Sequence, residues 1–556
     1  MFRHYALLSM LGVFACTGAD TDTDTDSDTE TDTDTDTDVE IDPAEFCNNL
    51  GLTYREFDTG EAGRLRHELA GDFSLPLEDG STWTYSDHWT GCDSVILLPH
   101  AIETAWNDES SVWFTGIDAL IDASPPNAIY IFIPYTGLKG LHDEVGIPMR
   151  ESIDMALASR SDEEAAWWRN RLIVPDKVFT DFDHWVADSF LTFGSAYGIG
   201  VDTTQHIRTL GGLADVNQYD SSTPDGRWPW ASQLYMAAHE TTYWNFENIR
   251  QQRLDAVETD EVVLFDRFLG AQYEDIEVTL PDVATLQTYD TLEIDVVMEC
   301  PDEEAREQGN CGAWDYLAHM YLMPEGEEGS SQEMARFITT YHRESRWVVD
   351  ATQALPWLIE GARNRTFRYS WAPSWNTQPT IISVRLRLSN QGKGYRPLQT
   401  VPLFTGGSFN SGYNEGREEP LDVDIPASAT RVELRSIITG HGGDGSNNCA
   451  EFCNHQHEFT VGSSTYFKEH TIAGSGQGCE EAIADGVVPN QSGTWWFGRG
   501  GWCPGQRVDP NIDDVTGDIT AGSTVQTSYK GKWRGGEVTD SAGGNIKLSS
   551  WLVIYE

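Results

Sequence analysis

The sequence predicts a multidomain protein in which an α/β domain is followed by two antiparallel β-sandwiches. A chain of 556 residues is longer than one hydrophobic core usually organises. Its 39% hydrophobic residues and 20 tryptophans suffice to bury several cores. Helix-like and strand-like periodicities alternate in the first part of the chain, whereas short β-runs separated by turn residues fill the second part.

The N-terminus predicts export. Arg3 and His4 precede an apolar run at 5–14, which is too short to span a bilayer and is typical of a signal peptide. The sequence Val-Phe-Ala-Cys at 13–16 resembles a bacterial lipobox. We therefore expect residues 1–16 to be a lipoprotein signal and Cys16 to be lipidated, which would place the protein in the cell envelope, at the outer membrane or the cell surface. An ordinary signal peptide is the alternative.

Residues 17–45 are mostly a Thr-Asp alternation. Such a segment repels itself and has nothing to bury, so we expect a disordered spacer rather than a calcium site. The formal net charge of −53 argues against nucleic acid and anionic membrane surfaces as partners, so membrane contact is expected through the lipid anchor only.

Residues 46–261 have the pattern of an α/β domain of unknown role. A buried strand is predicted at 128–135, and helices are predicted at 116–123, 151–172 and 230–254. The pair His239-Glu240 does not complete a zinc-protease motif, because Tyr243 occupies the position of the second histidine. We expect this pair to lie on a helix surface.

The remaining chain is predicted to form two β-sandwiches, at 262–392 and 393–556. The strand-like runs are 276–280, 291–298, 318–322, 336–341, 366–371, 380–388 and a series from 399 to 549–555. Turn residues separate these runs at the spacing typical of sandwiches.

Three short segments combine an ionisable group, an aromatic ring and cysteines. They are 300–316 with Asp315, 436–453 with Glu451, and 489–505 with Arg499. A cysteine-bracketed turn restricts a carboxylate, and an aromatic surface removes its water, which raises its pKa toward the range of general acid–base catalysis. Structural turns with surface carboxylates are the alternative interpretation.

Together these segments resemble the bacterial peptide-N-glycosidase F family. The resemblance rests on the Cys-x-x-Trp-Asp turn at 311–315, the Cys-Ala-Glu-Phe-Cys loop at 449–453 and the Arg-Gly-Gly-Trp-Cys-Pro-Gly run at 499–505. These motifs follow the family's order and have similar separations. Residues 336–339 and 490–492 add matches, so the resemblance extends from about residue 262 to the C-terminus.

The resemblance implies two jelly rolls, a pair also similar to that of copper-dependent monooxygenases, and an amidase that needs no metal or other cofactor. It implies cleavage between an N-linked glycan and the asparagine side chain of glycoproteins or glycopeptides. Asp315 would be the principal catalytic carboxylate and Glu451 the assisting one. The substrate-binding residues would be Trp314, Trp375, Phe452, His441, Arg499 and Trp502.

Nine cysteines less Cys16 leave eight, an even number that favours disulfides in an exported chain. Eight cysteines allow about a hundred pairings. Proximity and the resemblance together select four pairs: Cys47 with Cys92, Cys300 with Cys311, Cys449 with Cys453, and Cys479 with Cys503.

The chain departs from the family at a third functional carboxylate. When Trp375 is aligned with the family's tryptophan, Pro373 stands where the family has a glutamate, with Ser370 and Trp371 nearby. Tyr316 replaces an arginine, and His441 replaces a tryptophan. These changes predict a different glycan preference or weak activity. They also motivate an alternative, a glycan-binding surface lipoprotein that has lost catalysis.

A metal site is the remaining alternative. His455 and His457 form a His-x-His on a predicted strand, which places both imidazoles on one face. Copper or zinc could bind there with His441 as a third ligand, as in a monooxygenase-like protein. Histidines hydrogen-bonded around a disulfide turn are the commoner arrangement.

Overall fold

The computed structural model describes residues 42–100, 112–113, 115–134, 142–194, 198–214, 216, 233–326, 329–442 and 449–556. The predicted signal peptide, Cys16 and the spacer up to residue 41 lie outside this part. Helix α1 (Pro43–Asn49) begins inside the predicted spacer, so the expected spacer end at residue 45 is wrong. Among the described residues, no helix is both long and apolar enough to cross a membrane.

The first part of the chain is organised around a mixed five-stranded sheet in the order β5-β4-β3-β6-β7. Parallel pairing joins β3 to β4 and β4 to β5, and the other pairs are antiparallel. The strands are β3 (Ser94–His100), β4 (Ala128–Pro134), β5 (Leu172–Ile173), β6 (Ile199–Val201) and β7 (Ile207–Thr209). A two-stranded hairpin of β1 (Ser74–Pro76) and β2 (Thr82–Thr84) lies outside this sheet.

Both faces of the mixed sheet are buried. Successive residues of β3 and β4 alternate between two cores: Ile96 and Tyr130 belong to one, and Val95 and Ile129 to the other. Burial on two sides explains why both strands read as continuous apolar runs. The helices of this part are α3 (Ile117–Ala123), α4 (His142–Leu157), α5 (Asp162–Arg169), α6 (Trp185–Phe193) and α7 (Ala238–Asp255).

The helix predicted at 151–172 is two helices and a strand. The Ser161 hydroxyl accepts a hydrogen bond from the Glu164 amide and starts α5, which interrupts the helical pattern after α4. Leu172 already belongs to β5. Ser161, in the middle of the helical pattern, therefore marks the N-cap of α5.

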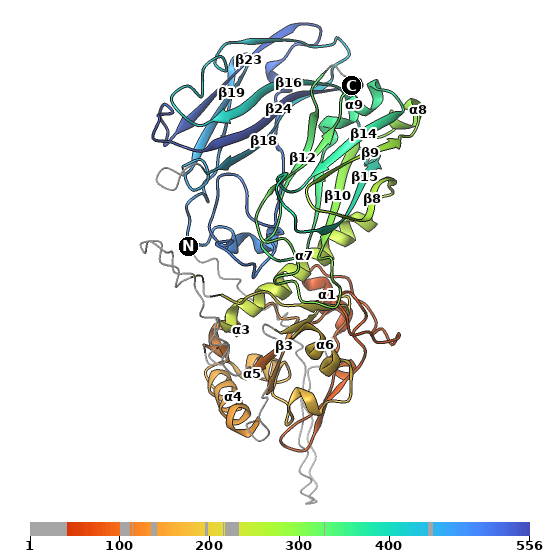
Figure 1. Cartoon of the computed structure of the whole chain (residues 1–556), viewed down its shortest axis with the longest axis vertical. Helices are drawn as coiled ribbons and strands as arrows, with labels where there is room; N and C mark the ends of the chain where they lie inside the picture. Colours follow the sequence, from red (N-terminus) through yellow and green to blue (C-terminus); the bar gives the residue numbers. More distant parts are fainter. Residues whose placement is uncertain are drawn as a thin grey trace, which may run out of the picture. The chain divides into compact units, whose positions relative to one another are not determined.

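The second part of the chain forms two antiparallel sandwiches (Figure 1). The first consists of the sheets β13-β10-β15-β8 and β21-β12-β11-β14-β9. Its strands are β8 (Asp260–Gly270), β9 (Tyr273–Thr279), β10 (Thr291–Glu299), β11 (Leu317–Leu322), β12 (Gln332–Ile338), β13 (Ser345–Asp350), β14 (Asn364–Ser370), β15 (Thr380–Ser389) and β21 (Arg507–Val508), with short helices α8 (Val283–Leu286) and α9 (Leu355–Glu360).

The second sandwich consists of the sheets β16-β24-β18-β22 and β17-β23-β19-β20. Its strands are β16 (Pro397–Ser408), β17 (Leu421–Asp424), β18 (Arg431–His441), β19 (His455–Val461), β20 (Ser464–Glu469), β22 (Asn511–Asp514), β23 (Thr524–Trp533) and β24 (Asn545–Tyr555). A mostly β, multidomain fold with antiparallel sandwich-like sheets is thus confirmed.

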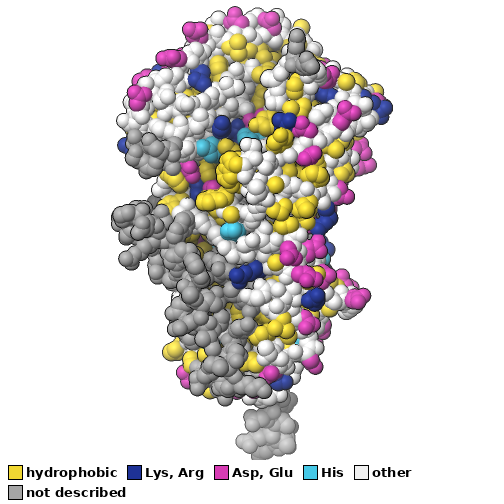
Figure 2. All heavy atoms as spheres, viewed as in Figure 1, with side chains coloured by type: hydrophobic (Ala, Val, Ile, Leu, Met, Phe, Trp, Pro, Cys, Tyr) yellow, Lys and Arg dark blue, Asp and Glu magenta, His cyan; other side chains and the backbone are white. Residues whose placement is uncertain are grey.

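The three parts are interlocked. Strand β21 comes from the second half of the chain but pairs with β12 of the first sandwich. Trp495, Trp496 and Val488 join one core of the mixed sheet, together with Trp244 of α7. Figure 1 shows α7 between the mixed sheet and the sandwiches, and Figure 2 shows hydrophobic side chains gathered in the middle of one face, with acidic ones along its margins.

Helix α7 corrects the interpretation of His239 and Glu240 as helix surface. Glu240 is 0% exposed and forms an ion pair with Arg343 at 3.0 Å, and His239 contacts a carboxylate oxygen of Glu480 at 3.0 Å. Both partners lie in the second part of the chain, far away in sequence. The sequence pattern of one helix could not show them.

Candidate active site

Asp315 lies in a turn that several contacts hold in place. The Cys300–Cys311 disulfide closes the segment before it. The Thr339 hydroxyl donates to the Trp314 carbonyl at 2.7 Å and accepts from the Tyr316 amide at 2.7 Å, so that it clamps both neighbours of Asp315. The backbone of the turn is therefore held on both sides of Asp315.

Glu451 lies in the loop that the Cys449–Cys453 disulfide closes. One carboxylate oxygen accepts a hydrogen bond from the Gly442 amide at 2.9 Å. The Glu451 carbonyl accepts another from the Gly500 amide at 2.7 Å. These contacts tie the loop to the end of β18 and to the segment that carries Arg499.

Arg499 joins the two carboxylates. Its Nη2 lies 3.6 Å from Asp315 Oδ2, and its Nε donates to Glu451 Oε1 at 3.3 Å. The side chain is 1% exposed, donates to the Phe497 carbonyl at 2.9 Å, and packs its guanidinium against the rings of Phe452 and Trp502. The structure thus brings together Asp315, Glu451 and Arg499, as the sequence predicted.

The environment of Asp315 changes its acidity. Burial raises the pKa of Asp315 from 3.8 to about 6, and the negative charge of Glu451 adds to the rise. The Arg499 guanidinium and a hydrogen bond from the Tyr341 hydroxyl oppose it. A carboxyl group with a pKa near 6 can exchange a proton at neutral pH, which suits general acid–base catalysis.

Sequence reasoning missed Tyr341. It was placed at the end of a predicted strand, whereas β12 ends at Ile338 and Tyr341 lies in the turn beyond it. Its ring lies edge-on to Trp314, with centroids 6.4 Å apart, and proximity to Asp315 and burial raise the pKa of its hydroxyl. The only available signal was its position two residues beyond the family-like segment 336–339.

Two tryptophans next to Asp315 are exposed. Trp314 is 57% exposed, and Trp375 is 68% exposed and packs edge-on against Tyr316 at 5.8 Å. Exposed indole faces beside a polar centre are suited to the apolar faces of sugars. Phe452, at the other side of Arg499, contacts Phe497 with ring centroids 6.4 Å apart.

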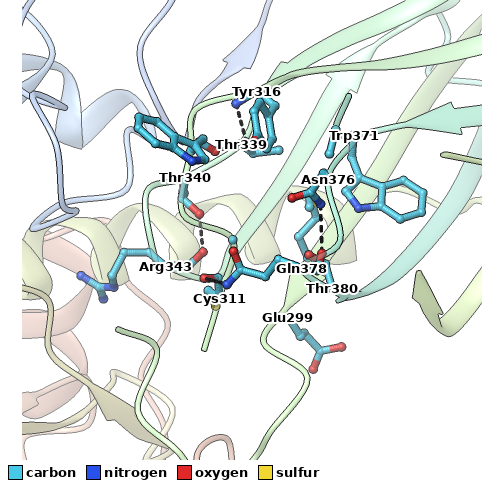
Figure 3. Close-up of a pocket in the computed structure, with 14 residues that line it drawn as sticks. Glu299, Cys311, Tyr316, Thr339, Thr340, Arg343, Trp371, Asn376, Gln378 and Thr380 are labelled. Atoms are coloured by element: carbon cyan, nitrogen blue, oxygen red, sulfur yellow. Dashed lines mark hydrogen bonds between the residues drawn. The ribbon is translucent and has the colours of Figure 1, made fainter. Parts of the chain in front are cut away.

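A small cavity of about 30 Å³ lies behind the turn of Asp315 (Figure 3). It has room for a water molecule or two, but not for a sugar ring. Thr339, Thr340, Gln378 and Asn376 line it, and Figure 3 shows their polar atoms engaged with one another or with the backbone.

The position predicted to lack the third carboxylate lies near this cavity. Trp371 lines it and is buried, and Glu299 is the one carboxylate among its described lining residues. Glu299 accepts a hydrogen bond from Arg267 at 2.7 Å, so it is already paired.

Trp502 was predicted to bind substrate, and its burial contradicts this. It is 4% exposed, donates its indole N–H to the Gly440 carbonyl at 2.7 Å, and lies under Arg499. His441 stacks on Trp502 at 5.1 Å and contacts the Thr439 hydroxyl at 2.8 Å. Trp502 therefore supports the site from below, because its own faces are covered by protein.

All four expected disulfides are present, Cys47–Cys92, Cys300–Cys311, Cys449–Cys453 and Cys479–Cys503. Two of them bracket the segments that carry Asp315 and Glu451. The Cys479–Cys503 disulfide closes the segment of Arg499. The disulfides thus fix the local geometry of all three charged groups.

His455 and His457 lie together on β19, as predicted, but His441 is not their neighbour in a ligand set. The third imidazole is His470, and one ring nitrogen of each lies within 4.8 Å of the other two. Burial lowers the pKa of His455 and His457 well below 6.5 and that of His470 to about 4, so all three are neutral at pH 7.

Residues 408–553 match the family described as peptide-N-glycosidase F, C-terminal domain. A relative from Elizabethkingia miricola, peptide-N(4)-(N-acetyl-beta-D-glucosaminyl)asparagine amidase F, is 27% identical over 273 residues, which cover 46% of this chain and 71% of the relative.

Two solved structures are also similar to part of this chain. Peptide-N-glycosidase F from Flavobacterium meningosepticum is 23% identical, covers 53% of this chain and 96% of its own, and has a TM-score of 0.42. The structure of PNGF-II is 13% identical, covers 64% of this chain and 74% of its own, and has a TM-score of 0.38.

The sequence matches confirm the resemblance that the cysteine-bracketed motifs predicted. The family match spans the loop of Glu451 and the segment of Arg499. Over this part of the chain the protein is similar to the peptide-N-glycosidase F family.

Proposed function

We propose that this protein is an amidase that cleaves the bond between an N-linked glycan and the asparagine side chain of glycoproteins or glycopeptides. Asp315 is the principal catalytic carboxylate, and Glu451 assists it. The observation that carries the proposal is the convergence of these two carboxylates on the buried guanidinium of Arg499. Similarity to the peptide-N-glycosidase F family over part of the chain supports the same class of reaction.

The proposed reaction is a hydrolysis. A water oxygen bonds to the carbonyl carbon of the asparagine side chain, and the bond from that carbon to the glycosylated nitrogen breaks. The nitrogen gains a proton and leaves as a glycosylamine, while an aspartate remains. Asp315, with its raised pKa, can take the proton of the water and return it to the nitrogen. Glu451 orients water and the first sugar.

The proposed substrates fit the chemistry of the surroundings. Trp314 and Trp375 offer apolar faces to sugar rings beside the carboxylate pair. Four disulfides are typical of an oxidising compartment outside the cytosol. We propose that the protein is exported and acts on external glycoproteins, with Cys16 as its lipid anchor.

Mass spectrometry of a high-mannose or sialylated glycopeptide tests the proposal. Incubation should convert the asparagine to aspartate and release the intact glycan. Asp315→Asn should lower kcat/KM roughly 10²–10⁴-fold, because it removes the acid–base group. Asp266→Asn is the matched control, since Asp266 has a side chain that is 72% exposed on β8 and should leave turnover unchanged.

A glycan-binding protein without turnover is the second candidate. The exposure of Trp314 and Trp375 and the absence of a glutamate at Pro373 favour it. It predicts that glycopeptide binds, stays intact across several glycan classes, and binds equally to Asp315→Asn. Conversion that disappears in Asp315→Asn would exclude this candidate.

A further inference from the structure

Three histidines converge at the start of the hairpin formed by β19 and β20. Gln456 pairs with Glu469 across the two strands. His455 and His457 flank Gln456, so their side chains emerge on the face opposite to that of Gln456. His470 follows Glu469 and therefore stands across from His455. This register places one imidazole from each position on a single face of the sheet.

The three rings are arranged around a shared point rather than stacked. Their centroids are 4.6 to 5.7 Å apart, and their planes are inclined to one another by 64° to 83°. Inclined rings can turn their nitrogen-bearing edges toward one centre. One ring nitrogen of each histidine lies within 4.8 Å of one ring nitrogen of the other two.

The nitrogens facing the centre are close together. His455 Nδ1 lies 2.6 Å from His457 Nε2. The other nitrogen of His457 contacts the Tyr529 hydroxyl at 2.6 Å, and Tyr529 in turn contacts Tyr413 at 2.8 Å. An outer hydrogen bond of this kind fixes the tautomer and orientation of a metal-binding histidine.

Within this cluster, two buried ring nitrogens have no side-chain hydrogen-bond partner among the described residues. They are Nε2 of His455 and Nε2 of His470. The backbone of Ala450 lies against the His455 ring. His455 Nε2 faces Gly440 and Gly500, whereas His455 Nδ1 faces His457. Leaving a buried polar nitrogen unpaired is costly, so the Nε2 of His470 is the nitrogen that a cation in the cluster could satisfy.

We propose that His455, His457 and His470 bind one divalent transition-metal ion, and that Zn²⁺ is the ion this ligand set suits best. Three neutral imidazoles are a ligand set that zinc accepts, with nitrogen–metal distances of about 2.0–2.1 Å. Two nitrogens on one such ion are about 3 Å apart, so binding requires only a small separation of His455 from His457.

The ion would act on the loop of Glu451 rather than on the substrate. A Cβ atom at Gly440 would lie 1.7 Å from the Ala450 carbonyl oxygen and 2.3 Å from His455 Nε2. A Cβ atom at Gly500 would meet the same two atoms at 2.5 and 2.4 Å. The histidine cluster therefore packs directly against Ala450, the neighbour of Glu451. Metal binding would hold this loop to the hairpin.

Metal analysis of the full chain, purified without a histidine tag from zinc-supplemented cells, tests the proposal. Wild type should retain close to one equivalent of zinc after desalting. His470→Ala should lose it. His441→Ala is the matched control, because it removes a nearby imidazole outside the cluster and should retain the ion. Far-UV circular dichroism reports whether each variant folds.

Thermal unfolding of the wild-type protein provides a second measurement that needs no variant. The melting temperature should be higher with Zn²⁺ than with EDTA, since an ion that binds only the folded state stabilises it. Wild type without zinc and without a zinc-dependent melting temperature would overturn the proposal. So would equal zinc retention by folded His470→Ala. Neither measurement involves glycopeptide, so failure of the amidase proposal would be seen separately.

Discussion

Asp315 is held between groups that shift its acidity in opposite directions. Glu451 raises its pKa, whereas Tyr341 and Arg499 lower it, and burial dominates. If ionised Asp315 is the base, the pH profile of kcat/KM should have a rising limb with its midpoint near pH 6. The limb is the measurable signature of this carboxyl group.

The neighbours of Asp315 predict how this limb moves. Tyr341→Phe removes a hydrogen bond to the ionised form, so the limb should move to higher pH by up to about one unit. Glu451→Gln removes a negative neighbour, so the limb of the residual activity should move to lower pH. Glycopeptide turnover from pH 4.5 to 8 measures both, and shifts in the same direction would contradict the assignment.

Asp315 should also cost the protein stability at neutral pH. The folded state holds the proton of Asp315 up to about pH 6, whereas the unfolded chain releases it near pH 3.8. The free energy of unfolding therefore decreases as pH rises between these values. Asp315→Asn should raise it by up to about 3 kcal/mol at pH 7 and by little at pH 4.

Denaturant unfolding of wild type and Asp315→Asn at both pH values measures this difference. Asp266→Asn serves again as the exposed control. A variant that is inactive and less stable than wild type at pH 7 would show that Asn disturbs the turn, which would weaken its use as a probe of catalysis.

Among the elements, the Cys449–Cys453 loop and the Cys47–Cys92 disulfide should separate activity from stability. They span 4 and 45 residues. Removing the longer one should lower the free energy of unfolding by about 4 kcal/mol, and removing the shorter one by about 2 kcal/mol. The effect on activity should have the opposite order. Removing the Cys449–Cys453 disulfide should lower activity more than removing Cys47–Cys92, because only the short loop carries Glu451.

The paired Cys→Ser variants at 449/453 and at 47/92 test this prediction by turnover and denaturant unfolding. The pair at 449/453 should lose activity at a temperature where it remains folded. Loss of activity in the 47/92 pair under conditions where it is folded would show instead that the mixed sheet influences the site directly.

At the scale of the whole molecule, buried ion pairs connect helix α7, which packs on the mixed sheet, to the segment that precedes Asp315. Arg343 pairs with Glu240 of α7 and with Glu307, which lies in the segment closed by Cys300–Cys311. All three are buried. Glu240→Gln should destabilise the protein by about 3 kcal/mol, because it leaves the buried Arg343 charge poorly compensated.

Glu258→Gln, at an exposed position just beyond α7, is the control and should leave stability within about 0.5 kcal/mol of wild type. Thermal or denaturant unfolding compares the two. A Glu240→Gln variant as stable as its control would mean that the buried ion pair does not join these parts energetically.

The segments that carry Asp315, Glu451 and Arg499 could be recognised in the sequence because their signals are local. The turn of Asp315, the loop of Glu451 and the segment of Arg499 are each bracketed by cysteines in a short stretch, so residue types and spacing were informative. Burial was harder to predict. From the sequence, Trp502 is predicted to bind a sugar, but in the structure Arg499 and His441 cover its faces. Glu240 reads as helix surface but is paired inside the protein.

By itself, the sequence determined the kinds of strands and turns, the resemblance to the peptide-N-glycosidase F family and, once that resemblance was recognised, the three short-range cysteine pairs. These follow from periodicity, spacing and residue type within short windows. Only the tertiary structure decided that Tyr341 reaches Asp315, that His470 rather than His441 joins His455 and His457, and that α7 packs on the second half of the chain. These contacts join residues far apart in sequence, and strand register and side-chain burial, which depend on the whole fold, select them.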